Sequence, residues 1–362
     1  MENIGVGVIG CGKIAESKHI PCLLREKQAH LVGLCDLAGS ERPRMLKEKF
    51  SLSDCRAYAS VEEMLKDPAI HVVHICTPNA FHAELAIAAL RSGKHVFCEK
   101  PMAVSLKEAK QMAQEAEKQK RSLTVCANHR FRPESLYLKE LCRQKALGEI
   151  YYAKASILRR RGVPAWGQFL QKKAQGGGAL VDVGVHALDL CLWLLEDDPP
   201  VAVTGHVYDR LGKQTSAANP YGSWTPEQFQ VEDFGVGIIR LQSGATVCLE
   251  ASWMLNTRRE RGVGVELYGT RAGADMENGL WINGERNGRL YNEEILFQSS
   301  PVAFQTLETE TPAQKELHLW LEALSNGQPP VVRPEQMVRV MSVLEGIYRS
   351  SREGHTVRLN DD

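Results

Sequence analysis

The stretch GVIGCGKIAESKH, residues 7–19, decides the fold of the first part of the chain. It places the pattern Gly10-x-Gly12-x-x-Ala15 after an apolar run and at the start of a helical pattern. At such a place the first glycine makes a tight turn, the second lets the backbone approach a pyrophosphate, and the small third residue permits close helix packing. The helix N-terminus adds backbone N–H donors for an anion. The stretch therefore predicts a dinucleotide-binding turn rather than an ordinary glycine-rich turn between a strand and a helix.

A carboxylate stands where such a turn needs one. Asp36 follows the next apolar run, residues 30–35, at about 20 residues beyond the glycines. A carboxylate there accepts hydrogen bonds from both hydroxyls of the adenosine ribose, and it repels the 2′-phosphate of NADP. We therefore expect NAD as the cofactor and NADP to be less favoured, while Arg42 and Arg44 are close enough in sequence to leave NADP open.

The first 130 residues alternate short apolar runs with longer helical patterns, which indicates βαβ units and a parallel sheet. Two S-x-x-E sequences, beginning at Ser60 and Ser105, match helix capping boxes, and Gly93 is placed to end a helix. We predict a doubly wound α/β dinucleotide-binding domain over residues 1–130. Its expected strands are 5–9, 30–35, 72–76, 95–98 and 123–127.

The texture of the sequence changes after residue 130. Long runs alternate apolar and polar residues, as in FGVGIIRLQSGATVCLEASWM, which indicates a mostly antiparallel sheet with one covered face. Ser243-Gly244 predicts the tight turn of a hairpin within that run. We assign residues 131–362 to a second, α/β domain. Its connection 209–230 is too long for an idle loop, and a lid, a partner contact and a mobile excursion all remain open.

Composition limits the classes of function. The 362 residues favour two domains, and 44 basic residues against 44 acidic ones leave no net charge, so a general nucleic-acid binder is not expected. There is no secretory signal pattern and no uninterrupted apolar run of about 18 residues, so we expect a cytoplasmic protein without a membrane partner. The ten cysteines form no C-x-x-C pair and the 11 histidines show no ligand spacing, so we expect no metal. We interpret His74, inside an apolar run, as a core histidine.

Polar residues gather where two of the predicted strands end. Thr77, Asn79 and His82 follow one strand, and Glu99 and Lys100 follow the next. The carboxyl ends of parallel strands form the edge at which open α/β sheets bind ligands. We therefore expect these residues beside the cofactor, with a turn residue or a helix cap as the alternative for Asn79 and His82. A lysine at this edge can stabilise charge that develops on a carbinol oxygen.

A second set of polar residues lies on an apolar helix. The stretch GGGALVDVGVHALDLCLWLL, residues 176–195, carries Asp182, His186 and Asp189 among Leu, Val and Ala. At 3.6 residues per turn these three side chains share one helix face. A helix edge that touches water, or a core histidine paired with a carboxylate, is the alternative to a site.

Taken together, the motifs resemble the glucose–fructose oxidoreductase/inositol dehydrogenase/rhizopine catabolism (Gfo/Idh/MocA) family. The resemblance spans nearly the whole chain through GVIGCGKIA, CTPNAFHAELAIAAL, GKHVFCEKPMA, NHRF and GGGALVDVGVHALD. It implies a Rossmann domain followed by an α/β domain with a large, mostly antiparallel open sheet, which often carries oligomer contacts. It also implies oxidation of a sugar or cyclitol hydroxyl, or the reverse reduction.

Carried onto this chain, the resemblance assigns Lys100, Asp182 and His186 as catalytic residues. It also places Glu99 near the nicotinamide ribose and Trp166 towards the nicotinamide end. We expect the polar helix face to meet the substrate in a crevice between the domains, with His186 as general base, Lys100 polarising the oxygen, and Asp182 binding a neighbouring hydroxyl or orienting the base. The expected cofactor-binding residues are Gly10, Gly12, Lys13, Ile14, Asp36, Thr77, Asn79, His82, Glu99, Lys100, Asn128 and Trp166.

The predicted function is therefore hydride transfer between NAD(H) and a secondary hydroxyl or carbonyl of a sugar, sugar derivative or cyclitol. One alternative keeps the fold but uses transient oxidation to cleave a glycoside without net formation of NADH. Another is a non-catalytic regulator that senses NAD. The expected partners are a polyhydroxylated small molecule and further copies of the chain, as a homodimer or homotetramer through the second sheet.

Overall fold

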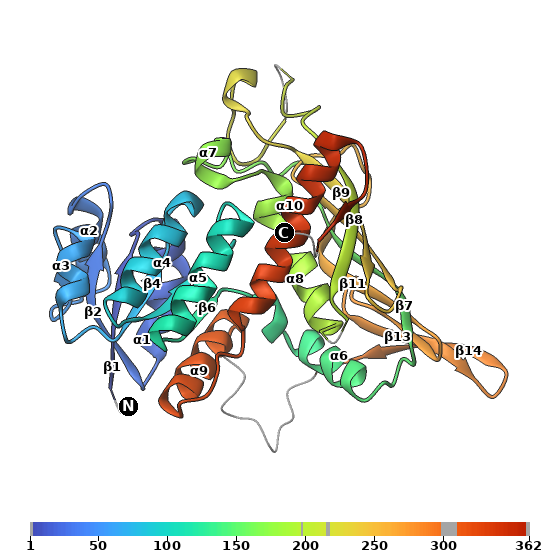
Figure 1. The fold of residues 1–362 in the computed structure, drawn as a ribbon, viewed down its shortest axis with the longest axis horizontal. Helices are drawn as coiled ribbons and strands as arrows, with labels where there is room; N and C mark the ends of the chain where they lie inside the picture. Colours follow the sequence, from blue (N-terminus) through green and yellow to red (C-terminus); the bar gives the residue numbers. More distant parts are fainter. Residues whose placement is uncertain (1–2, 197, 215–217, 298–309, 360–362) are drawn as a thin grey trace. The chain divides into compact units, whose positions relative to one another are not determined.

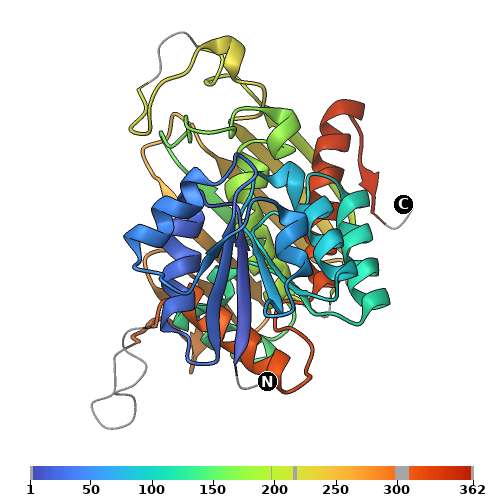
Figure 2. The same cartoon turned by 90° about the vertical axis from the view of Figure 1, so that its left-hand side faces the viewer.

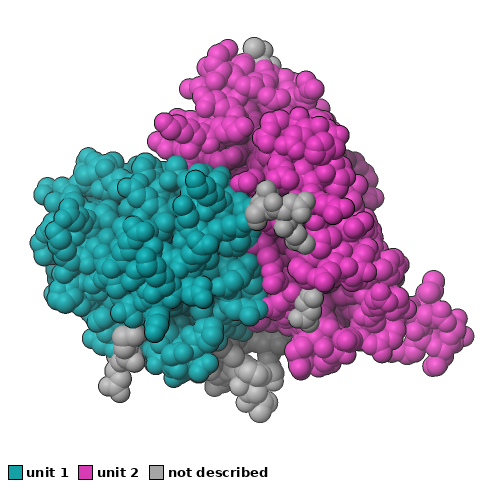
Figure 3. Space-filling view, in the orientation of Figure 1, with its two compact units in different colours: residues 1–126, 310–338 teal, residues 127–309, 339–362 magenta. Residues whose placement is uncertain are grey.

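The structure is a computed structural model, and it describes residues 3–196, 198–214, 218–297 and 310–359. The chain divides into two compact units. Unit 1 comprises residues 1–126 and 310–338, and unit 2 comprises residues 127–309 and 339–362 (Figure 3). The first unit thus takes up a segment from late in the chain, whereas the predicted domains were the continuous ranges 1–130 and 131–362.

Unit 1 is built on a six-stranded parallel sheet in the order β3-β2-β1-β4-β5-β6. Figure 2 shows its strands with helices on both sides, which is the doubly wound arrangement predicted from the alternating pattern. The strands are β1 Ile4–Ile9, β2 Ala29–Cys35, β3 Arg56–Ala57, β4 Val72–Ile75, β5 His95–Cys98 and β6 Leu123–Val125. The main helices are α1 Ile20–Arg25, α2 Glu41–Lys49, α3 Val61–Lys66, α4 His82–Arg91, α5 Leu106–Gln119 and α9 Pro312–Ser325.

The helix boundaries follow the signals in the sequence. The Ser60 and Ser105 side chains accept hydrogen bonds from the backbone N–H three residues later, at 3.2 and 3.3 Å, as N-caps do. Gly93 lies just beyond α4 with φ of +76°, a left-handed conformation that costs glycine little. The two serine N-caps and the predicted stop are confirmed, whereas the return bond from the glutamate that completes a capping box stays a prediction.

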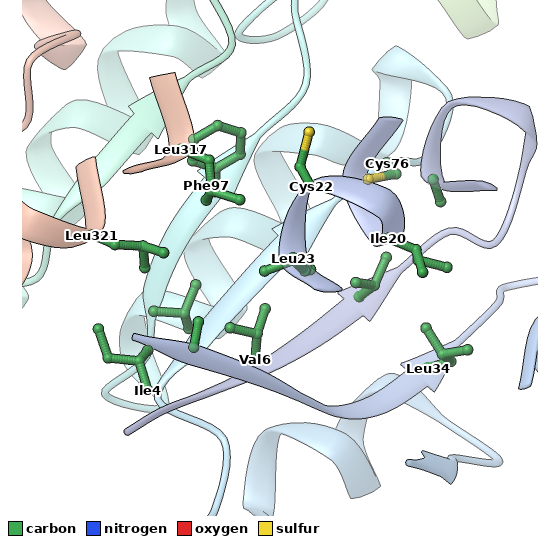
Figure 4. Close-up of a cluster of buried hydrophobic side chains, with 14 of the residues drawn as sticks. Ile4, Val6, Ile20, Cys22, Leu23, Leu34, Cys76, Phe97, Leu317 and Leu321 are labelled. Carbon is green, nitrogen blue, oxygen red and sulfur yellow. The ribbon is translucent and has the colours of Figure 1, made fainter. Parts of the chain in front are cut away.

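Helix α9 completes the core of unit 1 although more than 200 residues separate it from most of the sheet. Its Leu317 and Leu321 pack into the buried cluster with Ile4, Val6 and Phe97 (Figure 4). His74 is fully buried beside this cluster, as expected for a core histidine, and its ring stacks on Phe97.

Unit 2 is built on a nine-stranded sheet in the order β14-β13-β12-β11-β7-β10-β9-β8-β15 (Figure 1). Only the pair β7 and β10 is parallel among the described pairings, so the sheet is mostly antiparallel, as predicted. The strands are β7 Ile150–Leu158, β8 Pro200–Tyr208, β9 Phe234–Leu241, β10 Thr246–Ser252, β11 Arg261–Gly269, β12 Ala272–Asp275, β13 Leu280–Arg286, β14 Arg289–Ile295 and β15 Val357–Arg358.

The hairpin of β9 and β10 turns at Ser243-Gly244, as the sequence predicted, with Gly244 at φ of +98°. Two helical segments, η4 Leu180–Gly184 and α8 Val185–Leu194, continue one another and pack on β7, β10 and β11. Together with α7 Lys172–Gln175 they form the one helical stretch in the described chain that is long and apolar enough to cross a membrane. Because 83% of its apolar window is buried inside the fold, we interpret it as a core helix.

The remaining helical segments of unit 2 are η3 Asn128–Phe131, α6 Pro133–Arg143, η5 Pro226–Gln228 and α10 Pro334–Glu353, and the first residues of α10 belong to unit 1. The long connection 209–230 is anchored at Asn219, which hydrogen-bonds the backbone N–H and the carbonyl of Val163 at 3.0 and 2.9 Å. Its role stays a prediction, and part of it, residues 215–217, lies outside the described residues.

Candidate functional site

The glycine-rich turn after β1 has the backbone that a dinucleotide needs. Gly10 adopts φ of +92°, and a Cβ at this position would lie 2.7 Å from the carbonyl carbon of Cys76, so only glycine fits. At Gly12 an added Cβ would meet nothing closer than an Arg42 guanidinium nitrogen at 3.9 Å. The backbone is therefore open on the side from which a pyrophosphate would approach, and the turn fits the phosphates of NAD.

Asp36 lies against this turn at the end of β2. Its two carboxylate oxygens accept hydrogen bonds from the backbone N–H groups of Cys11, at 2.7 Å, and Ala38, at 2.9 Å. These bonds fix the orientation of the carboxylate, and each oxygen keeps a further lone pair for a ribose hydroxyl. The geometry fits the predicted adenosine half of NAD.

The turn after β4 contributes Thr77 and Asn79 at the same edge. Thr77 is 8% exposed, and its buried hydroxyl has no hydrogen-bond partner within the described parts of the chain. A buried polar atom without a partner is costly, so the hydroxyl is suited to bind a cofactor group. Its proximity to Gly10, whose added Cβ would lie 2.9 Å from the Thr77 nitrogen, puts it beside the fingerprint.

His82 does not have the exposure expected of a cofactor neighbour. It is fully buried, and its Nδ1 and Nε2 lie 2.8 Å from the carbonyl of Pro101 and 3.0 Å from that of Thr77. Both polar atoms of the ring thus face the protein. The ring joins the turns after β4 and β5, and its contact with the cofactor stays a prediction.

Glu99 and Lys100 lie where β5 ends, as predicted, but in different surroundings. Lys100 is half-buried, whereas Glu99 is 6% exposed and pairs with Lys18 and with His19 Nε2, the latter at 2.8 Å. Burial alone would raise the pKa of the Glu99 carboxyl, but the charge of Lys18 and the hydrogen bond from His19 hold it well below its usual value. The carboxylate is therefore ionised, and the predicted contact with the ribose stays a prediction.

In unit 2 the three glycines allow the polar helix to start in a crowded place. An added Cβ at Gly177 would lie 2.0 Å from the Tyr348 hydroxyl, and one at Gly178 would lie 2.1 Å from the Glu232 carbonyl. The buried Glu232 carboxylate accepts hydrogen bonds from the N–H groups of Gly178 and Leu180 at 2.8 and 3.0 Å, and from Tyr348 at 2.7 Å. It therefore caps the helix that carries the predicted catalytic residues.

Two polar side chains are accessible on that helix. Asp182 and His186 are half-buried, whereas every other residue from 180 to 192 is buried. Trp253 Nε1 donates a hydrogen bond to Asp182 Oδ2 at 2.9 Å, and the His186 ring meets the His129 ring edge-on, with centroids 4.7 Å apart. Each candidate side chain is thus oriented by a partner within unit 2.

Asp189 has a structural role within unit 2. It is 3% exposed and receives two hydrogen bonds from the Arg130 guanidinium, at 2.9 and 2.5 Å. This bidentate pair fastens the helix to the segment η3. Asn128 begins η3 and is half-buried. Trp166 is 43% exposed and contacts the rings of Phe169 and Tyr221.

Several residues that orient the candidate site residues of the two units were not predicted from the sequence. Glu232, Trp253 and Arg130 act through contacts across unit 2, and such pairs cannot be read from spacing along the chain. His19 lies inside the quoted fingerprint stretch, and its position on the first helix pattern was the only available hint.

The comparisons with known proteins agree with this geometry. Residues 4–127 match the model of the "Oxidoreductase family, NAD-binding Rossmann fold", and residues 135–275 match the "GFO/IDH/MocA C-terminal domain". The chain is 33% identical to D-glucoside 3-dehydrogenase of Escherichia coli over 98% of its length and 97% of the relative's. It is 25% identical to myo-inositol 2-dehydrogenase of Thermotoga maritima over 98% of both chains.

Solved structures share the fold. A levoglucosan dehydrogenase in complex with NADH and levoglucosan superposes with a TM-score of 0.83 at 22% identity, over 99% of this chain and 100% of that one. An oxidoreductase domain protein from Kribbella flavida gives a TM-score of 0.84 at 23% identity over the whole of both chains. The resemblance seen in the motifs, the fold class and NAD as the cofactor are thus confirmed. The chain belongs to the Gfo/Idh/MocA family of NAD-binding sugar and cyclitol oxidoreductases, and it is a dehydrogenase.

Proposed function

We propose that the protein transfers a hydride between NAD(H) and a secondary hydroxyl or carbonyl of a sugar, sugar derivative or cyclitol. The observation that carries the proposal is the pair Asp182 and His186, which are the accessible residues on an otherwise buried stretch of helix. A carboxylate and an imidazole one helical turn apart can bind a hydroxyl and remove its proton.

The residues divide the work as follows. His186 accepts the proton of the reacting hydroxyl, and its contact with His129 limits the orientations of its ring. Lys100 donates a hydrogen bond to the oxygen as it becomes a carbonyl. Trp253 orients the Asp182 carboxylate by donating to its Oδ2, and this carboxylate binds a neighbouring hydroxyl of the substrate. NAD, when bound, supplies the hydride acceptor.

The proposed cofactor contacts follow the features of unit 1. The fingerprint residues Gly10, Gly12, Lys13 and Ile14 hold the pyrophosphate, and Asp36 holds the adenosine ribose. Thr77, Asn79, Asn128 and Trp166 are proposed to lie towards the nicotinamide half. The orphaned Thr77 hydroxyl supports the first of these assignments.

The proposed substrate carries several adjacent hydroxyl groups. Two observations support this class: a carboxylate and an imidazole are the accessible side chains of one helix, and relatives are named for D-glucosides and myo-inositol.

The test incubates the purified protein and NAD with inositols, aldoses and glycosides, and follows both the absorbance of NADH and the mass of the products. Stoichiometric NADH and a ketone product are expected with at least one polyol. Release of an aglycone without NADH would establish glycoside cleavage instead. Binding of NAD without turnover of any compound, together with unchanged binding in His186→Asn and Lys100→Met, would favour a sensor.

We also propose that the protein acts in the cytoplasm as a homodimer or homotetramer formed through the sheet of unit 2. The exposed aromatic and aliphatic side chains Tyr151 and Ile238, which are 57% and 53% exposed, support the choice of this sheet. All ten cysteines are free thiols, which suits a reducing compartment. Light scattering coupled to gel filtration, with Ile238→Lys as a variant that weakens the contact, tests the assembly.

A further inference from the structure

A row of ionisable side chains runs through the interior of unit 1 behind Lys100. Lys18 pairs with Glu99, Glu99 Oε1 lies 2.8 Å from His19 Nε2, and His19 Nδ1 lies 3.0 Å from His74 Nδ1. Glu99, His19 and His74 are 6%, 2% and 0% exposed. Neither Lys18 nor the two histidines has a place in the reaction proposed above.

The hydrogen-bond pattern fixes the protons of this row. Burial lowers the pKa of both His19 and His74, so the two rings are neutral. A neutral His19 that donates from Nε2 to Glu99 must accept at Nδ1, and His74 must then donate from its own Nδ1. This leaves His74 Nε2 without a proton, in keeping with its lack of a partner among the described residues. The row holds one ammonium and one carboxylate, and its charges balance.

The other oxygen of Glu99 is directed at the catalytic turn. The backbone N–H of Lys100 donates to Glu99 Oε2 at 3.2 Å. One residue further on, the carbonyl of Pro101 lies 2.8 Å from His82 Nδ1, and the same ring contacts the carbonyl of Thr77. Buried side chains thus hold the backbone on both sides of the Lys100 Cα: Glu99 binds the Lys100 N–H, and His82 contacts the Pro101 carbonyl.

We propose that Glu99 and His82 are positioning residues that fix the backbone on both sides of Lys100, and that Lys18 and His19 act by holding Glu99. Lys18 and His19 lie on the helical segment that follows the Gly10-x-Gly12 turn, and both contact Glu99. These contacts therefore also keep a constant distance between the glycine turn and the Lys100 turn. Because the backbone of Lys100 is already ordered, less conformational entropy is lost when its ammonium reaches the reacting oxygen in the transition state. This role replaces a direct contact of Glu99 with the cofactor.

A metal ion is not needed to explain the same cluster. The donor atoms of His19, Glu99 and Cys126 lie within 4.8 Å of one another, which is close enough to hold an ion. The Lys18 ammonium already supplies a cation to the Glu99 carboxylate, and burial raises the pKa of the Cys126 thiol, which keeps it protonated. A second cation would have to displace the first.

The kinetic part of the inference rests on the proposed function, but its first test does not. Glu99→Gln keeps the size of the side chain and removes its charge. Amide hydrogen exchange of a peptide covering residues 96–104, measured without cofactor or substrate, is expected to speed up by about tenfold, because a hydrogen bond to a charged group is lost. The dissociation constant for NAD is expected to stay within about threefold, while kcat falls by about 10- to 100-fold from misplacement of Lys100.

Glu115→Gln is the matched control, because Glu115 is another buried carboxylate of unit 1, on α5, where it accepts hydrogen bonds from Arg91 and Gln119 at 3.0 and 2.8 Å. It is expected to leave the exchange of 96–104 and kcat unchanged. Unchanged exchange in Glu99→Gln, or weakened NAD binding with unchanged kcat, would overturn the proposal, the second result by making Glu99 a cofactor ligand.

Two further variants keep the test decisive. Lys18→Met combined with Glu99→Gln removes both charges, so it avoids leaving either one buried alone, and it is expected to reproduce the faster exchange. His82→Asn is expected to speed exchange of the same peptide from its other side. If the wild-type protein oxidises no polyol at all, the proposed function fails, and the exchange results still decide whether Glu99 and His82 hold the turn.

Discussion

Asp36 determines the charge that the adenosine half of the cofactor meets. Its carboxylate is held against the fingerprint turn by the Cys11 and Ala38 N–H groups, so it cannot easily turn away from a 2′-phosphate. We expect the protein to bind NAD more tightly than NADP. Asp36→Ser is expected to reduce the ratio of the two dissociation constants by about tenfold or more, because it removes the repulsion between the carboxylate and the 2′-phosphate of NADP. Titration of both cofactors against the two proteins measures it. Tighter binding of NADP by the wild type would contradict the assignment.

His186 is the residue whose loss separates chemistry from cofactor binding. We expect His186→Asn to lower kcat by about 10²- to 10⁴-fold, the usual contribution of a general acid–base group, and to leave NADH affinity within a few-fold. Steady-state rates on the substrate found in the panel, with fluorescence titration of NADH, measure both quantities. Asp189→Asn is not a suitable control, because it breaks a buried pair with Arg130. Full activity of His186→Asn would mean that the ring is only a helix residue.

At the scale of the element, the polar helix depends on a cap that lies far away in sequence. Glu232 accepts three hydrogen bonds at the crowded glycine start of the helix, and Glu232→Ala would leave two backbone N–H groups and the Tyr348 hydroxyl without this acceptor. We expect a loss of about 3 kcal/mol in the free energy of unfolding. Glu232→Gln keeps an acceptor oxygen and is expected to lose much less. Urea denaturation compares them, and equal losses would show that the contact is not a cap.

The neighbouring Asp233 is predicted to make stability depend on pH. It is 2% exposed, and burial raises its pKa from 3.8 to about 6, although the Leu211 and Gly212 N–H groups oppose the rise. Between these values the folded protein holds a proton that the unfolded chain has lost, so this group's contribution to stability falls as pH rises from about 4 to about 6.

The comparison with Asp233→Asn isolates that contribution, because the other titrating groups cancel. The free energy of unfolding of the wild type minus that of the variant is expected to be larger at about pH 4 than at about pH 7, by at most about 3 kcal/mol. Denaturant titrations at the two pH values measure it. A difference that does not change with pH, or that grows with pH, would show that Asp233 is ionised in the folded state throughout.

Elements with a strong local pattern could be predicted from the sequence, and others could not. The alternation in residues 234–254 fixed the strands β9 and β10 and their turn, and Ser60 and Ser105 fixed helix starts. Strands β12 to β14 were not predicted. Strand β12 has only four residues, and β13 and β14 are mostly exposed or half-buried, so none of the three shows a clear alternation of apolar and polar residues. The partners of Asp182 and His186 were also invisible, since Trp253 and His129 meet them only through the fold.

For the whole molecule, the order of the two kinds of sheet along the chain was predictable, but the return of residues 310–338 to unit 1 was not. The change of pattern near residue 130 predicted two α/β parts, whereas nothing in Pro312–Ser325 indicates which part that amphipathic helix covers. The answer lies in long-range packing: Trp320 is 1% exposed, its ring lies 5.2 Å from that of Phe97, and its Nε1 donates to the Ser122 hydroxyl at 3.0 Å.

That packing predicts that unit 1 is unstable without its late helix. Trp320→Ala removes a large buried side chain and is expected to cost about 3–5 kcal/mol in the free energy of unfolding, whereas Trp320→Phe keeps a ring in the core and is expected to cost less. The loss must fall on the unit that binds NAD, so saturating NAD should offset part of it, because a ligand stabilises only the folded state to which it binds. Thermal unfolding with and without NAD measures the effect, and Trp281→Ala, at a half-buried position on β13 of unit 2, controls for the loss of an indole. If Trp320→Ala unfolds like the wild type, α9 does not belong to the core of unit 1 in solution.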